Sequence, residues 1–172
     1  MSVHIIIDGY NLIRQSSQWS RLDMQDMQLG REALLKALAG YKKKKAHRIT
    51  VVFDAAEVPG LMDRSESIGG ISVKFSNPGQ SADALIKHMA AELREGALVV
   101  SSDRDITDYA SSRGAAVIES PDFEMKMSLA LWGNDGYEDE ENTGWRPTTR
   151  KKGPGHRLKK RRRRNQSKIE KL

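Results

Sequence analysis

The stretch VHIIIDGYN, from Val3 to Asn11, determines how the rest of the chain can be interpreted. Its first part, Val3–Ile7, is a short apolar run rich in β-branched residues, and Asp8-Gly9 ends it. Such a run is typical of a strand buried on both faces, as in a parallel sheet that is covered by helices. We therefore expect Val3–Ile7 to be a buried strand near the centre of a sheet.

Strand and helix patterns then alternate as far as Trp132. Apolar β-branched or alternating segments predict further strands at 49–53, 71–75, 97–100 and 115–118. Apolar residues at helical spacing predict helices at 29–41, 81–93, 104–112 and 122–132, with N-caps at Ser81 and Asp122. Residues 55–70 contain Pro59 and several glycines without periodicity, so we expect an irregular connection there. This order predicts an α/β fold with a mostly parallel sheet.

Charge is distributed unevenly along the 172 residues. The segment from Arg146 to Leu172 contains 13 of the 29 Lys and Arg residues but one of the 23 acidic residues. This tail has a net charge of +12 and the rest of the chain −6, for a total of +6. We expect a folded domain at 1–133, an acidic linker at 134–145 and a basic, disordered tail at 146–172, because the last two lack an apolar stripe.

The composition excludes some kinds of protein. The chain has no cysteine, which excludes disulfides and cysteine-ligated zinc, and its four histidines lack metal-ligand spacing. No apolar run approaches the roughly 20 residues that span a bilayer, and the N-terminus has no signal-peptide pattern. We expect a cytoplasmic protein without membrane contact.

Aspartates lie where the predicted strands end. Three of them, Asp8, Asp54 and Asp103, follow strands, while Asp83 lies in the first turn of a helix and Asp105 closely follows Asp103. The carboxyl ends of parallel strands meet at one edge of a sheet, so we expect these side chains to converge. Converging carboxylates repel each other, no run of Lys, Arg or His is expected at this edge, and oxygen ligands suit Mg²⁺ or Mn²⁺. Any one aspartate could equally be a cap or turn residue, and only the group indicates a metal site.

Four motifs occur in order on these elements: Asp8-Gly9-Tyr10-Asn11, Val51–Ala55, Gln80–Asp83 and Ser101–Asp105. Together they resemble the NYN domain of the PIN-like nuclease superfamily, and most closely its bacterial YacP-like subgroup. The resemblance extends from about Val3 to Trp132. It implies a three-layer α/β/α PIN-like fold and a ribonuclease that depends on Mg²⁺ or Mn²⁺.

The resemblance also implies roles for individual residues. Its expected metal ligands, which are also the expected catalytic residues, are Asp8, Asp83, Asp103 and Asp105. Its expected substrate contacts are Asn11, Ser101 and Arg104. Asp54 would be a supporting or structural residue. Relatives often have a second acid directly after the Ala-Asp pair, where this chain has Ala84, and this departure would weaken one metal site or the activity.

A run of six cations in the tail suggests a second kind of substrate contact. The run consists of Lys159, Lys160, Arg161, Arg162, Arg163 and Arg164. Consecutive cations on a polar segment favour contacts with RNA phosphates, whether in an mRNA, an rRNA or a ribosome. Such contacts do not distinguish base sequence, and the tail could also be a solvated segment without a partner.

Two functional hypotheses follow. The first is a metal-dependent ribonuclease, most naturally an endoribonuclease, that hydrolyses RNA phosphodiester bonds with a metal-activated water. The alternative is a non-catalytic RNA- or ribosome-binding adaptor with a degenerate PIN-like site, which Ala84 favours. A phosphatase of the aspartyl-phosphate type is disfavoured, because Tyr10 stands where that chemistry needs a second aspartate.

Overall fold

Neighbouring residues of β1 (His4–Asp8) lie in two different hydrophobic cores. In the computed structural model, Ile5 and Ile7 pack on one face of the sheet with α3 (Met27–Lys44) and α6 (Ser120–Trp132). Ile6 packs on the other face with α4 (Ala82–Leu93) and α5 (Arg104–Ser112). This alternation is the side-chain period of a strand, and it requires a helical layer on each face. The structure describes residues 2–58, 60, 65–133 and 160–172.

Six strands form one sheet in the order β3-β4-β2-β1-β5-β6. Besides β1, the strands are β2 (Arg48–Phe53), β3 (Ser65–Ile68), β4 (Ile71–Phe75), β5 (Ala97–Val100) and β6 (Ala116–Ile118). Only β3 is antiparallel to its neighbour, and the other pairings are parallel. In register, His4 lies opposite both Arg48 and Ala97, so the carboxyl ends of the parallel strands share one edge.

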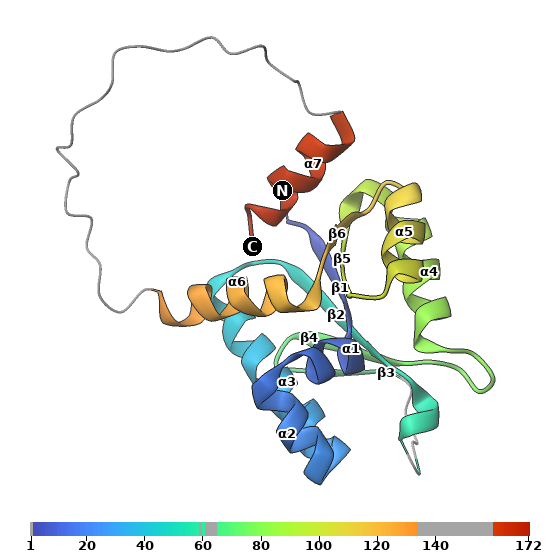
Figure 1. The fold of residues 1–172 in the computed structure, drawn as a ribbon, viewed down its shortest axis with the longest axis vertical. Helices are drawn as coiled ribbons and strands as arrows, with labels where there is room; N and C mark the ends of the chain where they lie inside the picture. The colour runs from blue at the N-terminus through green and yellow to red at the C-terminus, as the bar shows by residue number, and fades with distance from the viewer. Residues whose placement is uncertain (1, 59, 61–64, 134–159) are drawn as a thin grey trace, which may run out of the picture.

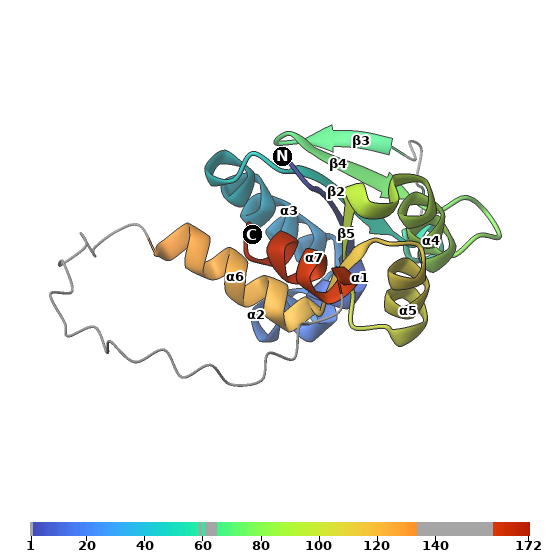
Figure 2. The ribbon, with the colours of Figure 1, turned by 90° about the horizontal axis from the view of Figure 1, so that it is seen from above.

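Helices cover both faces of this sheet. They are α1 (Gly9–Gln15), α2 (Ser17–Gln25), α3 (Met27–Lys44), α4 (Ala82–Leu93), α5 (Arg104–Ser112), α6 (Ser120–Trp132) and α7 (Lys160–Ile169), with short 3₁₀ turns η1 (Ala55–Glu57) and η2 (Arg94–Gly96). Figures 1 and 2 show α4 and α5 on one side of the sheet and α1, α2, α3 and α6 on the other. The expected α/β class with a three-layer, mostly parallel architecture is confirmed.

Several local expectations were wrong. The segment expected to be irregular contains β3, whose four residues are all exposed and therefore have no apolar period. Helices α1 and α2, which are only 7 and 9 residues long, were not predicted. Helix α6 begins at Ser120 with Glu119 as its N-cap, so Asp122 lies in its first turn and is not the cap.

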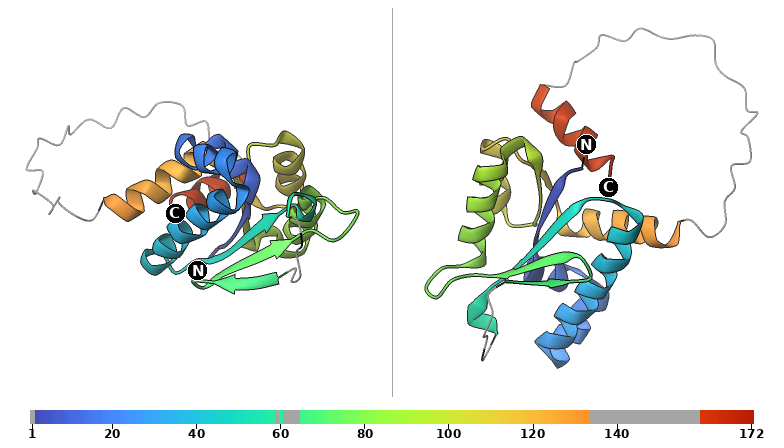
Figure 3. Two further views of the ribbon diagram at one scale, coloured as in Figure 1. Left: turned by 90° about the horizontal axis from the view of Figure 1, so that it is seen from below. Right: turned by 180° about the vertical axis from the view of Figure 1, so that it is seen from behind.

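The largest departure from expectation is at the end of the chain, which was expected to be disordered but contains a helix. Residues 160–169 form α7, and the terminal Leu172 is 5% exposed in the core. The Tyr41 hydroxyl donates to the Leu172 carbonyl at 2.9 Å, and Nε2 of buried His47 lies 3.1 Å from the Lys171 carbonyl. These contacts, and not an apolar stripe, hold the segment, and Figure 3 shows both chain ends on the same side of the molecule. The acidic linker at 134–145 and the rest of the tail to 159 lie outside the described residues.

Candidate nuclease site

Asp8 is the most buried acid of the expected site. It ends β1 and caps α1, and its carboxylate accepts hydrogen bonds from the Asn11 backbone N–H at 3.3 Å and from the Ser101 hydroxyl at 3.2 Å. Gly9 allows this sharp turn, since a Cβ there would lie 2.3 Å from the Phe53 ring. The residue is 8% exposed. Burial, together with repulsion from Asp83 and Asp103, raises the pKa of Asp8 to about 6, although the two hydrogen bonds oppose the increase.

Ser101 connects Asp8 with the next acid of the site. Its fully buried hydroxyl donates to Asp8 and accepts from the Asp103 backbone N–H at 3.1 Å. Asp103 in turn caps α5, because its Oδ1 accepts from the Asp105 N–H at 2.8 Å. Ser101 was expected to contact substrate, but the structure uses its hydroxyl to hold two carboxylate-bearing turns together.

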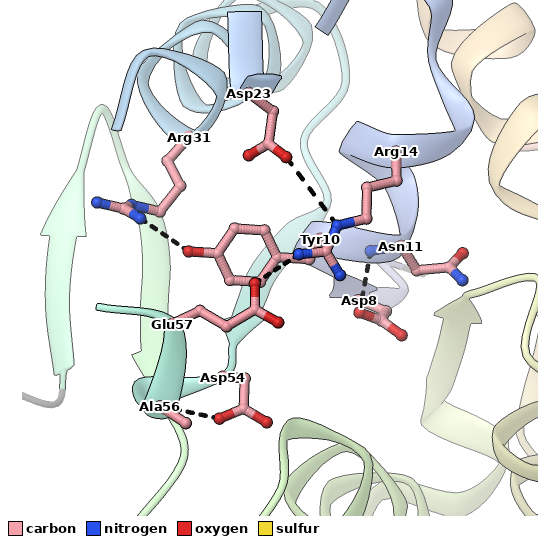
Figure 4. Close-up of polar contacts among 9 residues, drawn as sticks. All are labelled: Asp8, Tyr10, Asn11, Arg14, Asp23, Arg31, Asp54, Ala56 and Glu57. Carbon is pink, nitrogen blue, oxygen red and sulfur yellow. Dashed lines mark hydrogen bonds and ion pairs between the residues drawn. The ribbon is translucent and has the colours of Figure 1, made fainter. Parts of the chain in front are cut away.

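Asp83 and Asp54 complete the acidic edge. Asp83 lies in the first turn of α4. Burial and repulsion from Asp103 raise its pKa, with smaller contributions from Asp105 and Asp54 in the same direction. Asp54 caps η1, and its Oδ1 accepts from the Ala56 N–H at 2.9 Å (Figure 4). The structure therefore places carboxylates from four separate segments at one edge of the sheet, where they affect the pKa of Asp83.

The sequence analysis expected no run of basic residues at this edge, but a single lysine does lie there. Lys87 of α4 forms a salt bridge with Asp105, whose side chain is 77% exposed. The same lysine lowers the pKa of Asp83, and the carboxylates raise the pKa of Lys87, chiefly through the hydrogen bond that Lys87 donates to Asp105. The signal was present in the sequence, because Asp83 and Lys87 are four residues apart and therefore neighbours on a helix face. Asp105 is thus already paired with a cation.

Asn11 joins three loops at the carboxyl edge. Its Oδ1 accepts from the Ser102 backbone N–H at 2.9 Å and from the Ser120 hydroxyl at 2.7 Å. The Ser102 hydroxyl accepts from the Ser120 N–H at 3.2 Å. The amide oxygen of Asn11 is therefore engaged by the protein, and the turns after β1, β5 and β6 are held in fixed relation. Neither serine was expected to contribute to the site.

The sequence analysis did not single out Arg14, whose polar contacts are drawn in Figure 4. Arg14 of α1 binds Glu57 of η1 at 2.5 Å, lies 4.0 Å from the Asp23 carboxylate and stacks over the Tyr10 ring at 5.1 Å. These contacts connect η1 with α1, and so position the turn that contains Asp54. The side chain of Arg14 remains 54% exposed, which leaves part of it accessible to a ligand.

The remaining expected substrate contacts are not close together. Arg104 is exposed in the first turn of α5, next to Asp103. Of the six tail cations, Lys159 lies outside the described residues, and Lys160 to Arg164 belong to α7. Helix α7 packs on β6 and near the start of β1, not at the acidic edge. The tail cations are therefore not part of the aspartate cluster.

Comparison with known proteins identifies the family. Residues 5–171 match the YacP-like NYN domain, and the match includes helix α7. The chain belongs to the YacP-like NYN domain family. This family consists generally of nucleases.

Two YacP comparisons support the assignment. The chain is 30% identical over 89 residues to the uncharacterized protein YacP of Bacillus subtilis, and the match spans about half of each protein (52%). A crystal structure of Rae1 (YacP) from Bacillus subtilis has a TM-score of 0.62 and 26% identity, over 76% of this chain and 75% of that one. A single-substitution mutant of Rae1 has the same TM-score at 22% identity, over 74% and 76% of the two chains.

The donor chemistry of this YacP-like NYN domain fits a hard divalent cation, because every candidate ligand is a carboxylate. Within the described part of the chain, however, no three acidic or histidine side chains lie close enough together to hold one ion. Mg²⁺ commonly binds one or two carboxylates and retains several waters, so Asp8 with Asp83 or Asp103 would suffice. In the same described residues, no helix is both long and apolar enough to cross a membrane.

Proposed function

We propose that this YacP-like NYN domain is a metal-dependent endoribonuclease. The observation that carries the proposal is the placement of Asp8, Asp83 and Asp103, from β1, α4 and the turn after β5, at one edge of the sheet, where burial and then mutual repulsion raise the pKa values of Asp8 and Asp83. Carboxylates that destabilise one another in the free protein form a site prepared for a cation. Mg²⁺ or Mn²⁺ at this site would supply positive charge beside the scissile phosphate and activate a water.

The chain's own residues would position the carboxylates and the RNA. Ser101 fixes the orientation of the Asp8 carboxylate and, through the Asp103 N–H, that of the following turn. Asn11 holds the turn after β5 against the start of α6. Arg14 is a partly exposed cation of α1, and we propose that it contacts an RNA phosphate next to the one that is cleaved. Arg104 is proposed to do the same on the α5 side.

One observation favours a non-catalytic RNA-binding adaptor instead. Lys87 already neutralises Asp105, and the position after Asp83 is Ala84, so the site has fewer free carboxylates than expected. The two functions make opposite predictions for cleavage but the same prediction for RNA binding, which makes cleavage the decisive measurement.

The test uses a circular RNA, which only an endonuclease can cut, alongside a linear RNA of the same sequence. Wild-type protein is incubated with Mg²⁺, Mn²⁺ or EDTA and compared with Asp8→Asn and with Asp122→Asn as a matched control on the exposed start of α6. We expect linear products from the circle in Mg²⁺ or Mn²⁺, none in EDTA or with Asp8→Asn, and unchanged cleavage with Asp122→Asn. Cleavage that persists in EDTA would refute the metal mechanism, and binding without cleavage in every buffer would favour the adaptor.

A further inference from the structure

A cavity of about 600 Å³ lies between helix α7 and a second wall. Residues at or just after the ends of α4 and α5 form that second wall. Its α7 wall carries four cations, and its other wall includes Glu95, Gly114 and two alanines. The four cations are Lys160, Arg162, Arg164 and Lys168. Three of them, at positions 160, 164 and 168, are spaced four residues apart and so lie on one face of the helix.

This cavity is separate from the aspartate cluster. Glu95 precedes β5 and Ala116 begins β6, so both walls lie at the amino ends of the strands. The aspartates lie at the carboxyl ends of the same sheet. Figure 1 shows α7 beside the start of β1 and α1 at the other end of that strand.

Helix α7 is held firmly enough to present its cations at fixed positions. The side-chain amide of Asn165 accepts from the Val117 N–H at 2.8 Å and donates to the Val117 carbonyl at 3.4 Å. Leu172 is buried beyond the end of the helix. A docked helix loses less conformational freedom on binding than a disordered segment, which favours affinity.

The charges in the cavity do not balance. Among the described residues that line it, Glu95 is the single acid; its carboxylate pairs with Arg164, and its backbone carbonyl accepts from Lys168. Four cations and one acid leave a net charge of +3. Burial lowers the pKa of Lys168, and the neighbouring Arg164 and Lys171 lower it further, although Glu95 opposes them. An anion in the cavity would relieve this repulsion.

We propose that this cavity binds a phosphate of the RNA backbone and anchors RNA at the edge of the sheet opposite the aspartates. The choice of RNA as the polyanion rests on the proposed function. A phosphate is the group recognised, because the cavity offers four cations and none of its described lining residues has an aromatic ring on which a base could stack. In this proposal, one RNA molecule is held in the α7 cavity and cut at the aspartates.

The test measures binding of a labelled single-stranded RNA by fluorescence anisotropy in EDTA, over a series of salt concentrations. Lys160→Gln/Arg162→Gln removes two cavity cations, while Lys36→Gln/Lys43→Gln removes two exposed lysines of α3 as a matched control. Because one phosphate contact is lost, we expect the cavity variant to flatten the slope of log affinity against log salt by about 0.7, with about fivefold weaker binding at about 0.1 M salt. An equal loss in the control would mean diffuse attraction and would refute the site.

A third variant acts in the opposite direction. Glu95→Gln removes the acid that competes with phosphate for Arg164, so we expect RNA affinity to rise several-fold. If the Arg164–Glu95 pair only positions α7, affinity will instead fall, which contradicts the proposal. Competition by adenosine monophosphate as strong as by unlabelled RNA would mean a nucleotide site and would also contradict it.

These measurements need no metal and no cleavage. If the circular RNA stays intact but the cavity variants behave as expected, the anchor is supported and the nuclease proposal fails. If the circle is cut but the cavity variants bind like wild type, the nuclease proposal stands and the anchor fails.

Discussion

Asp8 is a carboxylate whose burial costs stability at neutral pH. Its pKa in the folded domain is about 6, above the ordinary value of 3.8, so between these values the folded state binds more protons than the unfolded state. The free energy of unfolding should therefore fall as pH rises from about 4 to about 6. A shift of about two units corresponds to a loss of about 3 kcal/mol as an upper limit.

We predict that Asp8→Asn removes this pH dependence without unfolding the domain. Asparagine remains a good N-cap for α1, so at pH 7.5 in EDTA the variant should be as stable as wild type or more stable. Urea denaturation of both proteins at pH 4.5 and pH 7.5 measures the effect, with the exposed Asp122→Asn as control. A variant that is clearly less stable at pH 7.5 would show that the Asp8 carboxylate has a structural role.

Lys87 competes with any divalent ion for the acidic edge. We predict that Lys87→Gln raises the affinity for Mn²⁺ several-fold, because Asp105 becomes free and Asp83 loses a neighbouring positive charge. Calorimetric titration with Mn²⁺ measures this affinity. Lys36→Gln, on the exposed face of α3, should leave it unchanged. Weaker Mn²⁺ binding by Lys87→Gln would mean that the lysine positions Asp105 as a ligand.

At the scale of elements, the last residues of the chain act as part of the core. We predict that Leu172→Ala lowers the free energy of unfolding by about 2 kcal/mol, because a buried leucine side chain is lost. Lys171→Gln is the matched control, since His47 contacts only the backbone carbonyl of Lys171. Chemical denaturation of the three proteins is the measurement. Equal stability of Leu172→Ala and wild type would mean that the C-terminus is not docked in solution.

The sequence was sufficient for the elements with an internal apolar period and insufficient for the others. Long helices such as α3 and buried strands such as β1 show a regular pattern that reports their buried face. Helix α7 has almost no apolar face and is held by Asn165 and the terminal Leu172, contacts that no periodicity reveals. For the same reason, the exposed strand β3 was missed.

Some features of the candidate site could likewise be predicted from the sequence, and others could not. Topology alone could place Asp8 and Asp103, which follow strands, and Asp83, which lies in the first turn of α4, at the same edge of the sheet. The hydrogen bonds of Asn11 to the turns after β5 and β6 depend on side-chain direction, which sequence does not give. Arg14 was missed because its helix was missed.

At the scale of the whole molecule, the two ends of the sheet carry opposite charge. Carboxylates gather at the carboxyl ends of the strands and the cations of α7 near the amino ends. RNA, as a polyanion, is attracted to the end with the α7 cations and repelled from the end with the carboxylates. RNA binding and the proposed RNA cleavage can therefore be altered by separate substitutions.

We predict that raising salt from about 50 to about 200 mM increases KM for RNA cleavage and leaves kcat nearly unchanged, because salt weakens phosphate contacts that hold the RNA before the chemical step. Lys160→Gln/Arg162→Gln should raise KM at low salt and reduce its further increase with salt. Steady-state kinetics with a labelled RNA gives both constants. A fall in kcat with unchanged KM would place the α7 cations at the chemical step and contradict the separation.

The amide of Asn165 has a consequence for how the molecule behaves among its own copies. Among the described strands, β6 pairs with β5 alone, and on its other side Asn165 satisfies the Val117 N–H and carbonyl as a further strand would. A strand with these groups free is a template for intermolecular pairing. The strand at the far end of the sheet, β3, is short and mostly polar, which makes it a poor template. We therefore expect a chain truncated before Lys160, which lacks α7, to self-associate through β6.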